Sequence, residues 1–184
     1  CKNKNNILEI VLRLLLLKFS KSQNLIQIYG IIILKTLSAS LDVFTIFETI
    51  YDLLIKNKDI NFVMKMTKVL NIFILEEKEC EIIRHQLTMD QNSKNNFFEK
   101  LFSLWSYNPF ITILLSLFCQ YFELSYNLTL ELTKMDLQVS DYIELCQMVQ
   151  IIESSIFNRV RMNLLNPKKN IYLVKTLYAL SMIL

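Results

Sequence analysis

Glycine is almost absent from this sequence, which holds one glycine, Gly30, and two prolines in 184 residues. Sheets joined by tight hairpins need residues that adopt positive φ at their turns, and they normally draw on more glycine than this. The scarcity therefore predicts an all-α protein. Isoleucine is abundant and lowers helix propensity slightly, but the burial of an amphipathic helix face outweighs such small differences.

Apolar residues recur at intervals of three and four along most of the chain, as they do on one face of a helix. Ser40 is expected to cap one such helix and Asp59 the next. Gly30 is expected to supply a left-handed bend between two shorter helical segments. The acidic cluster around residues 76–81 is expected at a helix junction, and the polar stretch near 88–96 is expected to be a loop.

An almost unbroken apolar run lies at residues 110–122, behind an Asn-Pro step. Pro109 suits the first position of a helix and biases Asn108 out of the α region, so Asn108 can act as the N-cap. Thr112 and Ser116 place small polar groups at intervals of four, a pattern that allows close approach of a neighbouring helix. A membrane span needs about 20 residues. The run is therefore expected to be a buried helix.

The expected helices are short, about 10 to 18 residues, and have brief connections, which is typical of antiparallel helix pairs that stack into a solenoid. We therefore predict an α-solenoid of HEAT-like antiparallel helix pairs, although no strict sequence period supports it. Residues 1–184 are expected to form one helical-repeat domain. Because the chain begins at Cys1 rather than Met, it is expected to be a fragment of a longer one.

Hydrophobic residues make up 53% of the chain and the mean hydropathy is +0.33, both high for a monomer of this size. Some helix faces are therefore expected to meet a partner, a second subunit or a neighbouring repeat. The net charge of +3 is too small to indicate nucleic-acid binding. A local basic surface is expected near the C-terminal end, at Arg159, Arg161, Lys168, Lys169 and Lys175; a solvated face is its default interpretation.

Catalytic and metal-binding patterns are missing from the sequence. One glycine cannot make a Gly-rich phosphate loop, and His85 is the single histidine. The four cysteines are far apart without a Cys-x-x-Cys pair, which gives no recognisable zinc site. Cys119 and Cys146 lie among apolar residues and are expected to be buried free thiols, as in a cytosolic protein. We therefore predict no enzyme, no cofactor and no metal.

Two ordered sets of residues in the second half carry a family resemblance. The first is a Leu-Phe pair, then Trp-x-x-Asn-Pro, then an apolar helix with Gln and Tyr: Leu101, Phe102, Trp105, Asn108, Pro109, Gln120 and Tyr121. The second is Val149, Gln150, Ile152, Glu153, Ile156, Phe157, Arg161, Leu164, Leu165, Tyr172, Leu173, Leu177 and Tyr178. A fainter match in the first half is Gly30, Leu37, Asp59, Phe62, Leu70, Asn71, Ile74, Arg84, Gln86 and Leu87. The chain thus resembles the C-terminal region of the vacuole-morphology HEAT-repeat scaffold of the phosphatidylinositol 3,5-bisphosphate synthesis complex.

The resemblance implies a non-catalytic scaffold. It implies binding to a Sac-domain phosphoinositide phosphatase, association of identical chains, and an assembly with a FYVE-domain phosphatidylinositol 3-phosphate 5-kinase. It implies a peripheral location on the cytosolic face of endolysosomal or vacuolar membranes, through these partners. The interaction or structural candidates that it implies are Trp105, Asn108, Pro109, Gln120, Tyr121, Arg161, Tyr172 and Tyr178.

Two alternatives remain open at this point. One is a different HEAT or armadillo adaptor, such as a transport or coat module. The other is a membrane-surface protein that uses the basic C-terminal end. Retention of a Sac-domain phosphatase would separate the scaffold from the adaptor, and flotation with anionic liposomes would test the membrane-surface protein.

Overall fold

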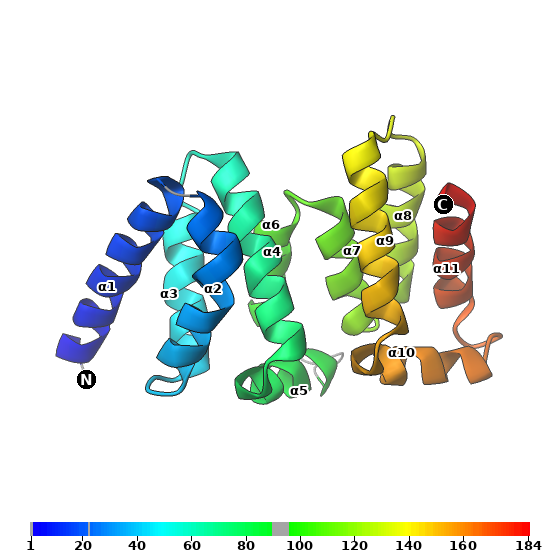
Figure 1. The fold of residues 1–184 in the computed structure, drawn as a ribbon. Helices are drawn as coiled ribbons and strands as arrows, with labels where there is room; N and C mark the ends of the chain where they lie inside the picture. The colour runs from blue at the N-terminus through cyan, green and yellow to red at the C-terminus, as the bar shows by residue number, and fades with distance from the viewer. Residues whose placement is uncertain (1, 22, 90–95) are drawn as a thin grey trace. The chain divides into compact units, whose positions relative to one another are not determined.

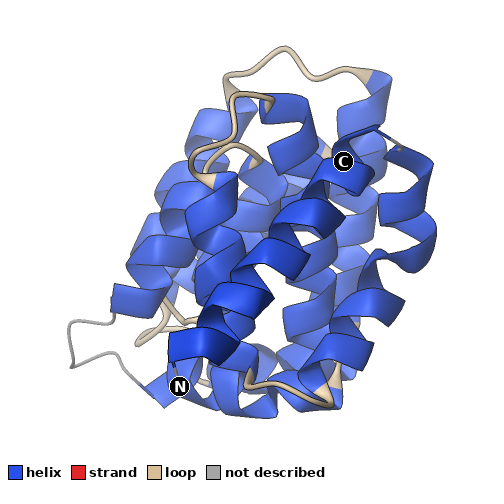
Figure 2. Ribbon diagram, turned by 90° about the vertical axis from the view of Figure 1, so that its left-hand side faces the viewer, coloured by secondary structure: helices blue, strands red, loops and turns tan. Residues whose placement is uncertain are grey.

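The computed structural model describes residues 2–21, 23–89 and 96–184, and every regular element in these ranges is helical (Figure 2). The predicted all-α, helical-repeat class is confirmed. The α-helices are α1 (Lys2–Lys21), α2 (Gln23–Ser38), α3 (Val43–Leu54), α4 (Ile60–Glu76), α5 (Glu81–Met89), α6 (Asn96–Trp105), α7 (Pro109–Phe118), α8 (Phe122–Thr133), α9 (Val139–Glu153), α10 (Asn158–Met162) and α11 (Ile171–Ile183). Three 3₁₀ turns join them, η1 (Lys78–Cys80), η2 (Ser155–Phe157) and η3 (Asn163–Leu165).

The chain divides into two compact units (Figure 1). Unit 1 is residues 1–86 and 96–107, and unit 2 is residues 87–95 and 108–184. The helices pack in a related order within each unit. In unit 1, α2 packs on α3 and α4, and α3 packs on α6; in unit 2, α7 packs on α8 and α9, and α8 packs on α11. The single domain expected for residues 1–184 stays a prediction.

The expected loop near 88–96 falls largely on residues 90–95, which lie outside the described residues. The described residues at its edges are helical, since Thr88 belongs to α5 and Asn96 begins α6. The acidic cluster before it lies at a helix junction, as predicted, because α4 ends at Glu76 and η1 leads into α5.

Aspartates cap the two central helices of unit 1. The Oδ1 atom of Asp59 accepts a hydrogen bond of 3.1 Å from the N–H of Phe62 at the start of α4, as predicted. Asp42 caps α3 and accepts a hydrogen bond of 3.0 Å from Thr45. The prediction of Ser40 as this cap is wrong, because the N–H of Ser40 still bonds to the carbonyl of Leu37 in the turn that ends α2.

Gly30 lies inside α2 and has no positive φ, so the predicted bend is wrong. The reason for glycine here is close approach. A Cβ atom at this position would lie 2.9 Å from the Cγ1 atom of Val69 on α4. The sequence pattern did not separate a helix-ending glycine from a helix-packing one, because both follow a run of apolar residues.

The apolar run of the sequence forms α7, the core helix of unit 2. Every residue from Phe110 to Phe118 is buried. The hydroxyls of Thr112 and Ser116 donate to the carbonyls one turn earlier, at 2.7 and 2.8 Å, so they are buried without loss of hydrogen bonding. None of the helices in the described ranges is long and apolar enough to cross a membrane.

Candidate functional site

Trp105 is a core residue of unit 1. Its side chain is fully buried at the end of α6, and its Nε1–H donates a hydrogen bond of 3.1 Å to the Oδ1 atom of Asn71 on α4. A buried indole usually needs such a partner for its N–H. Trp105 therefore acts through packing of α6 against α4, and it offers no surface to another molecule.

Asn108 and Pro109 build the start of α7 in unit 2. The buried Oδ1 atom of Asn108 accepts hydrogen bonds from the N–H groups of Phe110 and Ile111, at 3.0 and 3.2 Å. Its Nδ2 atom donates to the Glu144 carboxylate on α9 at 3.0 Å. The predicted N-cap is confirmed, and the same side chain links α7 to α9.

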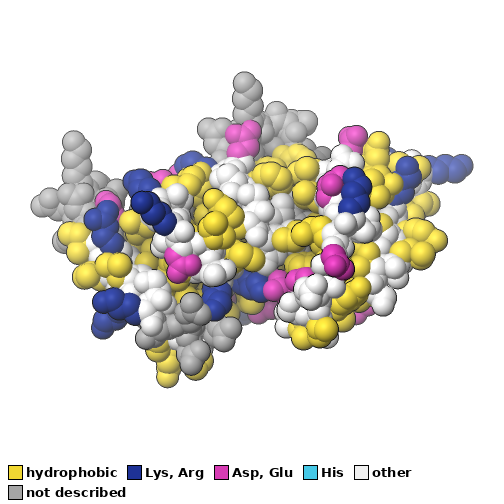
Figure 3. Space-filling model, turned by 90° about the horizontal axis from the view of Figure 1, so that it is seen from above, with side chains coloured by type: hydrophobic (Ala, Val, Ile, Leu, Met, Phe, Trp, Pro, Cys, Tyr) yellow, Lys and Arg dark blue, Asp and Glu magenta, His cyan; other side chains and the backbone are white. Residues whose placement is uncertain are grey.

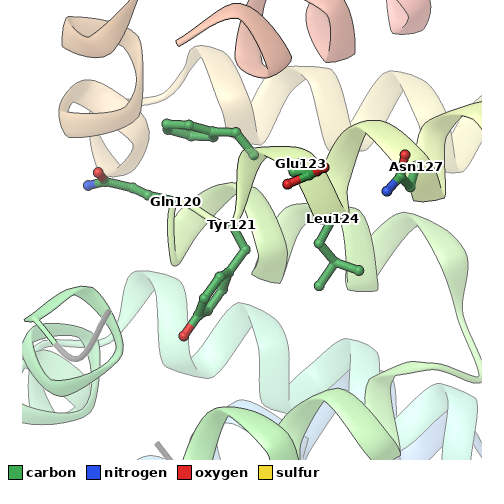
Figure 4. Close-up of a pocket in the computed structure, with 6 residues that line it drawn as sticks. Gln120, Tyr121, Glu123, Leu124 and Asn127 are labelled. Atoms are coloured by element: carbon green, nitrogen blue, oxygen red, sulfur yellow. The ribbon is translucent and has the colours of Figure 1, made fainter. Parts of the chain in front are cut away.

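Gln120 and Tyr121 form the connection between α7 and α8. Gln120 has a φ of 62°, and the N–H groups of Gln120 and Tyr121 bond to the carbonyls of Leu117 and Ser116 at 3.0 and 2.9 Å. This is the hydrogen-bond pattern with which helices end at a left-handed residue. Both side chains line an open hollow of about 580 Å³, together with Phe122, Glu123, Leu124 and Asn127. Figure 4 shows Tyr121 and Leu124 pointing the same way and Gln120 pointing elsewhere.

Arg161 fastens the end of α9 to α10. Its Nη1 atom donates to the carbonyls of Ile152 and Ser154, at 2.6 and 2.7 Å, and its Nη2 atom donates to the Oδ1 atom of Asn158. These carbonyls lie at a helix end, where four carbonyls lose their helical partners. The guanidinium replaces those partners, so Arg161 has a structural role.

Tyr172 holds α11 on α8. Its ring lies 5.9 Å from the ring of Tyr126 on α8, and the Lys175 ammonium lies 5.5 and 5.6 Å from the two ring centroids. Both distances are within the range of cation–π attraction. Beneath them, the hydroxyls of Thr176 and Ser125 are buried 3.3 Å apart. Tyr172 is therefore half-buried and structural, although Lys175 beside it is exposed.

Tyr178 belongs to an exposed apolar patch on the side of α11 that faces away from α8, next to the exposed Lys175. We call this the α11 outer face, and it comprises Ile171, Val174, Tyr178 and Met182. Tyr178 and Met182 are 67% and 69% exposed. Contiguous apolar surface of this kind marks interaction sites in soluble proteins. Of these residues, only Tyr178 was predicted as an interaction or structural candidate. The others could not be identified from the sequence, because their spacing fits a buried helix face equally well.

Unit 1 also has exposed apolar residues, which agrees with the surplus expected from composition. They lie at helical spacing on α1 and α2: Ile10, Val11, Leu14, Leu17, Leu25, Ile28, Tyr29 and Ile32. The run from Phe110 to Phe118 of α7, by contrast, is buried and offers no partner surface. In the basic C-terminal end, Lys168 and Lys169 are exposed.

Two of the described ionisable groups are buried thiols, Cys80 and Cys119. No cluster of three or more metal-ligating side chains occurs among the residues that the structure describes. Burial raises the pKa of the Cys80 thiol to about 12 and raises the pKa of Cys119 as well, so both thiols are protonated near neutral pH. Cys146 is exposed, and its predicted burial is wrong because it lies on the solvent side of α9.

Comparison with known proteins gives relatives over the whole chain. The chain is 28% identical over 185 aligned residues to vacuole morphology and inheritance protein 14 of Saccharomyces cerevisiae, covering 100% of this chain and 21% of that protein. It is 25% identical to an Arabidopsis thaliana VAC14 homologue over 90% of this chain and 23% of that protein. It is 27% identical to a Schizosaccharomyces pombe homologue, over 94% and 21% respectively. No solved structure matches.

The chain spans about a fifth of the length of these curated relatives. Residues 23–184 match the family model described as vacuolar protein 14 C-terminal Fig4p binding. This range includes the α11 outer face and every predicted site residue. The chain therefore belongs to the family of vacuolar protein 14 C-terminal regions.

Proposed function

We propose that this chain is a non-catalytic scaffold region that binds a Sac-domain phosphoinositide phosphatase of the Fig4p type. The family description names this binding, and the match covers residues 23–184. We further propose that copies of the chain associate and that the assembly contains a FYVE-domain phosphatidylinositol 3-phosphate 5-kinase. Its place is the cytosolic face of endolysosomal or vacuolar membranes, reached through partners, in keeping with the vacuole-morphology name of the yeast relative.

The observation that carries the proposal is the α11 outer face. The inner side of α11 packs on α8 through buried Leu173, Thr176 and Leu180, and this packing holds the helix in place within unit 2. Its outer side leaves large apolar side chains in water. Burial of such side chains favours association by about 25 cal/mol for each Å² removed from water. A scaffold that holds a phosphatase near a kinase raises their effective concentration without chemistry of its own.

Affinity capture tests this function. The full-length protein that carries this chain is tagged, co-expressed with its organism's Sac-domain phosphatase, and purified. We expect the phosphatase to be retained, and we expect Tyr178→Glu with Met182→Glu to reduce the retained amount at least about tenfold, because two charges would be desolvated in the interface. Both side chains are exposed, so circular dichroism of the variant should be unchanged.

The matched control is Met135→Glu with Val139→Glu, which adds the same charges at two other exposed apolar positions. The control should retain the phosphatase. Equal retention by both double variants would contradict the role of the α11 outer face. No retention by the unmodified protein would contradict phosphatase binding and would favour a different helical-repeat adaptor.

A further inference from the structure

A groove at one end of unit 1 combines cationic side chains with an aliphatic floor. One side is a face of α1, whose lining residues are three and four positions apart, and the other side is the end of α3 and its connection to α4. The groove has a volume of about 420 Å³. Its lining residues are Arg13, Leu16, Leu17, Ser20, Leu53, Lys56, Asn57 and Lys58.

The charges of the groove are unbalanced. Arg13, Lys56 and Lys58 line it, and no acidic residue does. Arg13 lies 3.7 Å from Glu9, but both side chains are more than half exposed, so this pair is weak. In the described part of the chain, Lys56 and Lys58 form no ion pair. Asp59 follows them directly, but its carboxylate caps α4.

The end of α1 and the connection between α3 and α4 lie at the top of Figure 1, and Figure 3 looks onto this end. Dark blue side chains stand among yellow ones on its left-hand side. Positive potential of this kind attracts anionic partners and speeds their association.

The floor of the groove is aliphatic. Leu16 is buried, Leu53 is half-buried, and Leu17 is 52% exposed although it lines a concave surface. An apolar ligand group on this floor would remove Leu17 from water. A ligand made only of phosphate or sugar groups would contact the cations, Ser20 and Asn57, but it would leave the gain at Leu17 unused.

We propose that this groove docks an acidic segment of another polypeptide, with an aliphatic side chain on the floor and carboxylates facing Arg13, Lys56 and Lys58. A flat bilayer surface does not fill a concave groove, and nucleic acid would favour aromatic stacking partners, which the lining lacks. The α1 side of the groove precedes the residues that match the Fig4p-binding model. Its other side, at Leu53, Lys56, Asn57 and Lys58, lies within those residues, but the groove shares no residue with the α11 outer face that is proposed to bind the phosphatase.

Fluorescence anisotropy with the full-length protein tests the proposal. The probe is a labelled 12-residue peptide of Glu and Asp with two leucines three positions apart. One comparison peptide has serine in place of leucine, and the other has Gln and Asn in place of the acids. We expect the acidic leucine peptide to bind at least about tenfold more tightly than either comparison peptide, because both charge and apolar contact contribute.

Charge reversal locates the binding. Arg13→Glu with Lys56→Glu and Lys58→Glu should weaken binding of the acidic leucine peptide at least about tenfold. The control, Lys134→Glu with Lys168→Glu and Lys169→Glu, changes the net charge equally and should leave binding within about twofold. Leu17→Ser should weaken binding without a change of charge. Capture of the phosphatase should be unchanged in all of these variants.

Four results would overturn the proposal: no binding of the acidic leucine peptide, equal binding of the serine peptide, equal weakening by both triple variants, or binding of phosphatidylserine vesicles through the same three cations without peptide binding. The last result would assign the groove to membrane contact. If the triple Glu variant fails to fold by circular dichroism, Arg13→Gln with Lys56→Gln and Lys58→Gln replaces it under the same criteria.

Discussion

Two helix joints, one in each unit, are built in the same way from different residues. In unit 1, the extended residue Glu77 follows the end of α4 at Glu76, and η1 comes next. Arg84 of α5 donates through Nη1 to the carbonyls of Ile74 and Glu77 at 2.6 and 2.7 Å. In unit 2, the extended residue Ser154 follows the end of α9 at Glu153, and η2 comes next. Arg161 donates through Nη1 to the carbonyls of Ile152 and Ser154, of which Ser154 matches Glu77 and Ile152 lies one residue beyond the match of Ile74. We call these the α4–α5 joint and the α9–α10 joint.

The two joints differ in what surrounds the arginine. Acidic residues flank the α4–α5 joint, and Glu77 also accepts a hydrogen bond of 2.6 Å from Lys35. The α9–α10 joint is stabilised by an aromatic contact, since the ring of Phe157 lies 5.7 Å from that of Phe118. At the corresponding position, the α4–α5 joint buries Cys80. The two joints share one arginine and one buried side chain, and the residues around these two differ.

Truncation of the buried side chain should give the largest difference in stability loss between the two joints. Phe157→Ala should lower the free energy of unfolding by about 3–5 kcal/mol, because it leaves a cavity against Phe118. Cys80→Ala removes only a sulfur and should cost about 1 kcal/mol. Urea denaturation followed by circular dichroism measures both. Similar losses for the two variants would show that the joints do not depend on their buried residues in this way.

Removal of the arginines should affect the joints equally. Arg84→Ala and Arg161→Ala should each cost about 2–3 kcal/mol, because two carbonyls lose a charged donor in each case. Lysine at either position should recover only part of this, since it lacks the planar fork of donors. Denaturation of the four variants gives the comparison. A loss at one joint and none at the other would disprove their equivalence.

The close approach of α2 to α4 has no glycine counterpart in α7, the corresponding helix of unit 2. Gly30→Ala should therefore cost about 1 kcal/mol, because the clash with the buried, β-branched Val69 exceeds the gain in helix propensity. Gly30→Ala combined with Val69→Ala should show a favourable coupling energy relative to the single variants. Stabilisation by Gly30→Ala alone would contradict the close approach.

The end of α7 differs from the end of α2, which has no residue with positive φ. Gln120→Gly should raise the free energy of unfolding by about 0.5–1 kcal/mol, because glycine adopts the left-handed region without steric cost. Ala39→Gly, in the turn after α2, should lower it by a similar amount through unfolded-state entropy. Thermal denaturation of both proteins checks the opposite signs. A change of the same sign in the free energy of unfolding of both variants would contradict this difference between the two helix ends.

Thiol labelling should distinguish buried from exposed cysteines without any change in stability. In a Cys1→Ser background at pH 8, Cys146 should react quickly with a thiol reagent. Cys80 and Cys119 should react only on unfolding, because burial excludes the reagent and raises the pKa of each thiol. Mass spectrometry of the labelled protein gives the sites. Rapid labelling of Cys80 in the folded protein would contradict its burial.

Features decided by neighbouring residues could be predicted from the sequence. Asn108 and Asp59 cap helices within three residues of themselves, and the composition alone excluded a glycine-dependent sheet fold. Gly30 could not be assigned, because its reason is Val69 on another helix. The two joints could not be predicted either, because they too depend on contacts between different helices. Ile74, Glu76 and Arg84 correspond to Ile151, Glu153 and Arg161 seventy-seven positions later. The arginines act through backbone carbonyls, however, and which carbonyls they reach is decided only by the fold.

The residues of the candidate site also fall into some that the sequence could identify and others that needed the structure. Family resemblance selected Trp105, Asn108 and Arg161, which the structure places in cores, caps and joints. Tyr178 alone among the predicted residues is largely exposed, and its neighbours on the α11 outer face required the structure, since only packing on α8 decides which side of α11 faces water.

The mass of the full-length protein in solution, measured by sedimentation with and without the Sac-domain phosphatase, tests the central claim most directly. We predict a discrete species heavier than one chain, whose mass increases by that of bound phosphatase when the phosphatase is added. A single-chain particle whose mass does not change on addition would contradict a scaffold function.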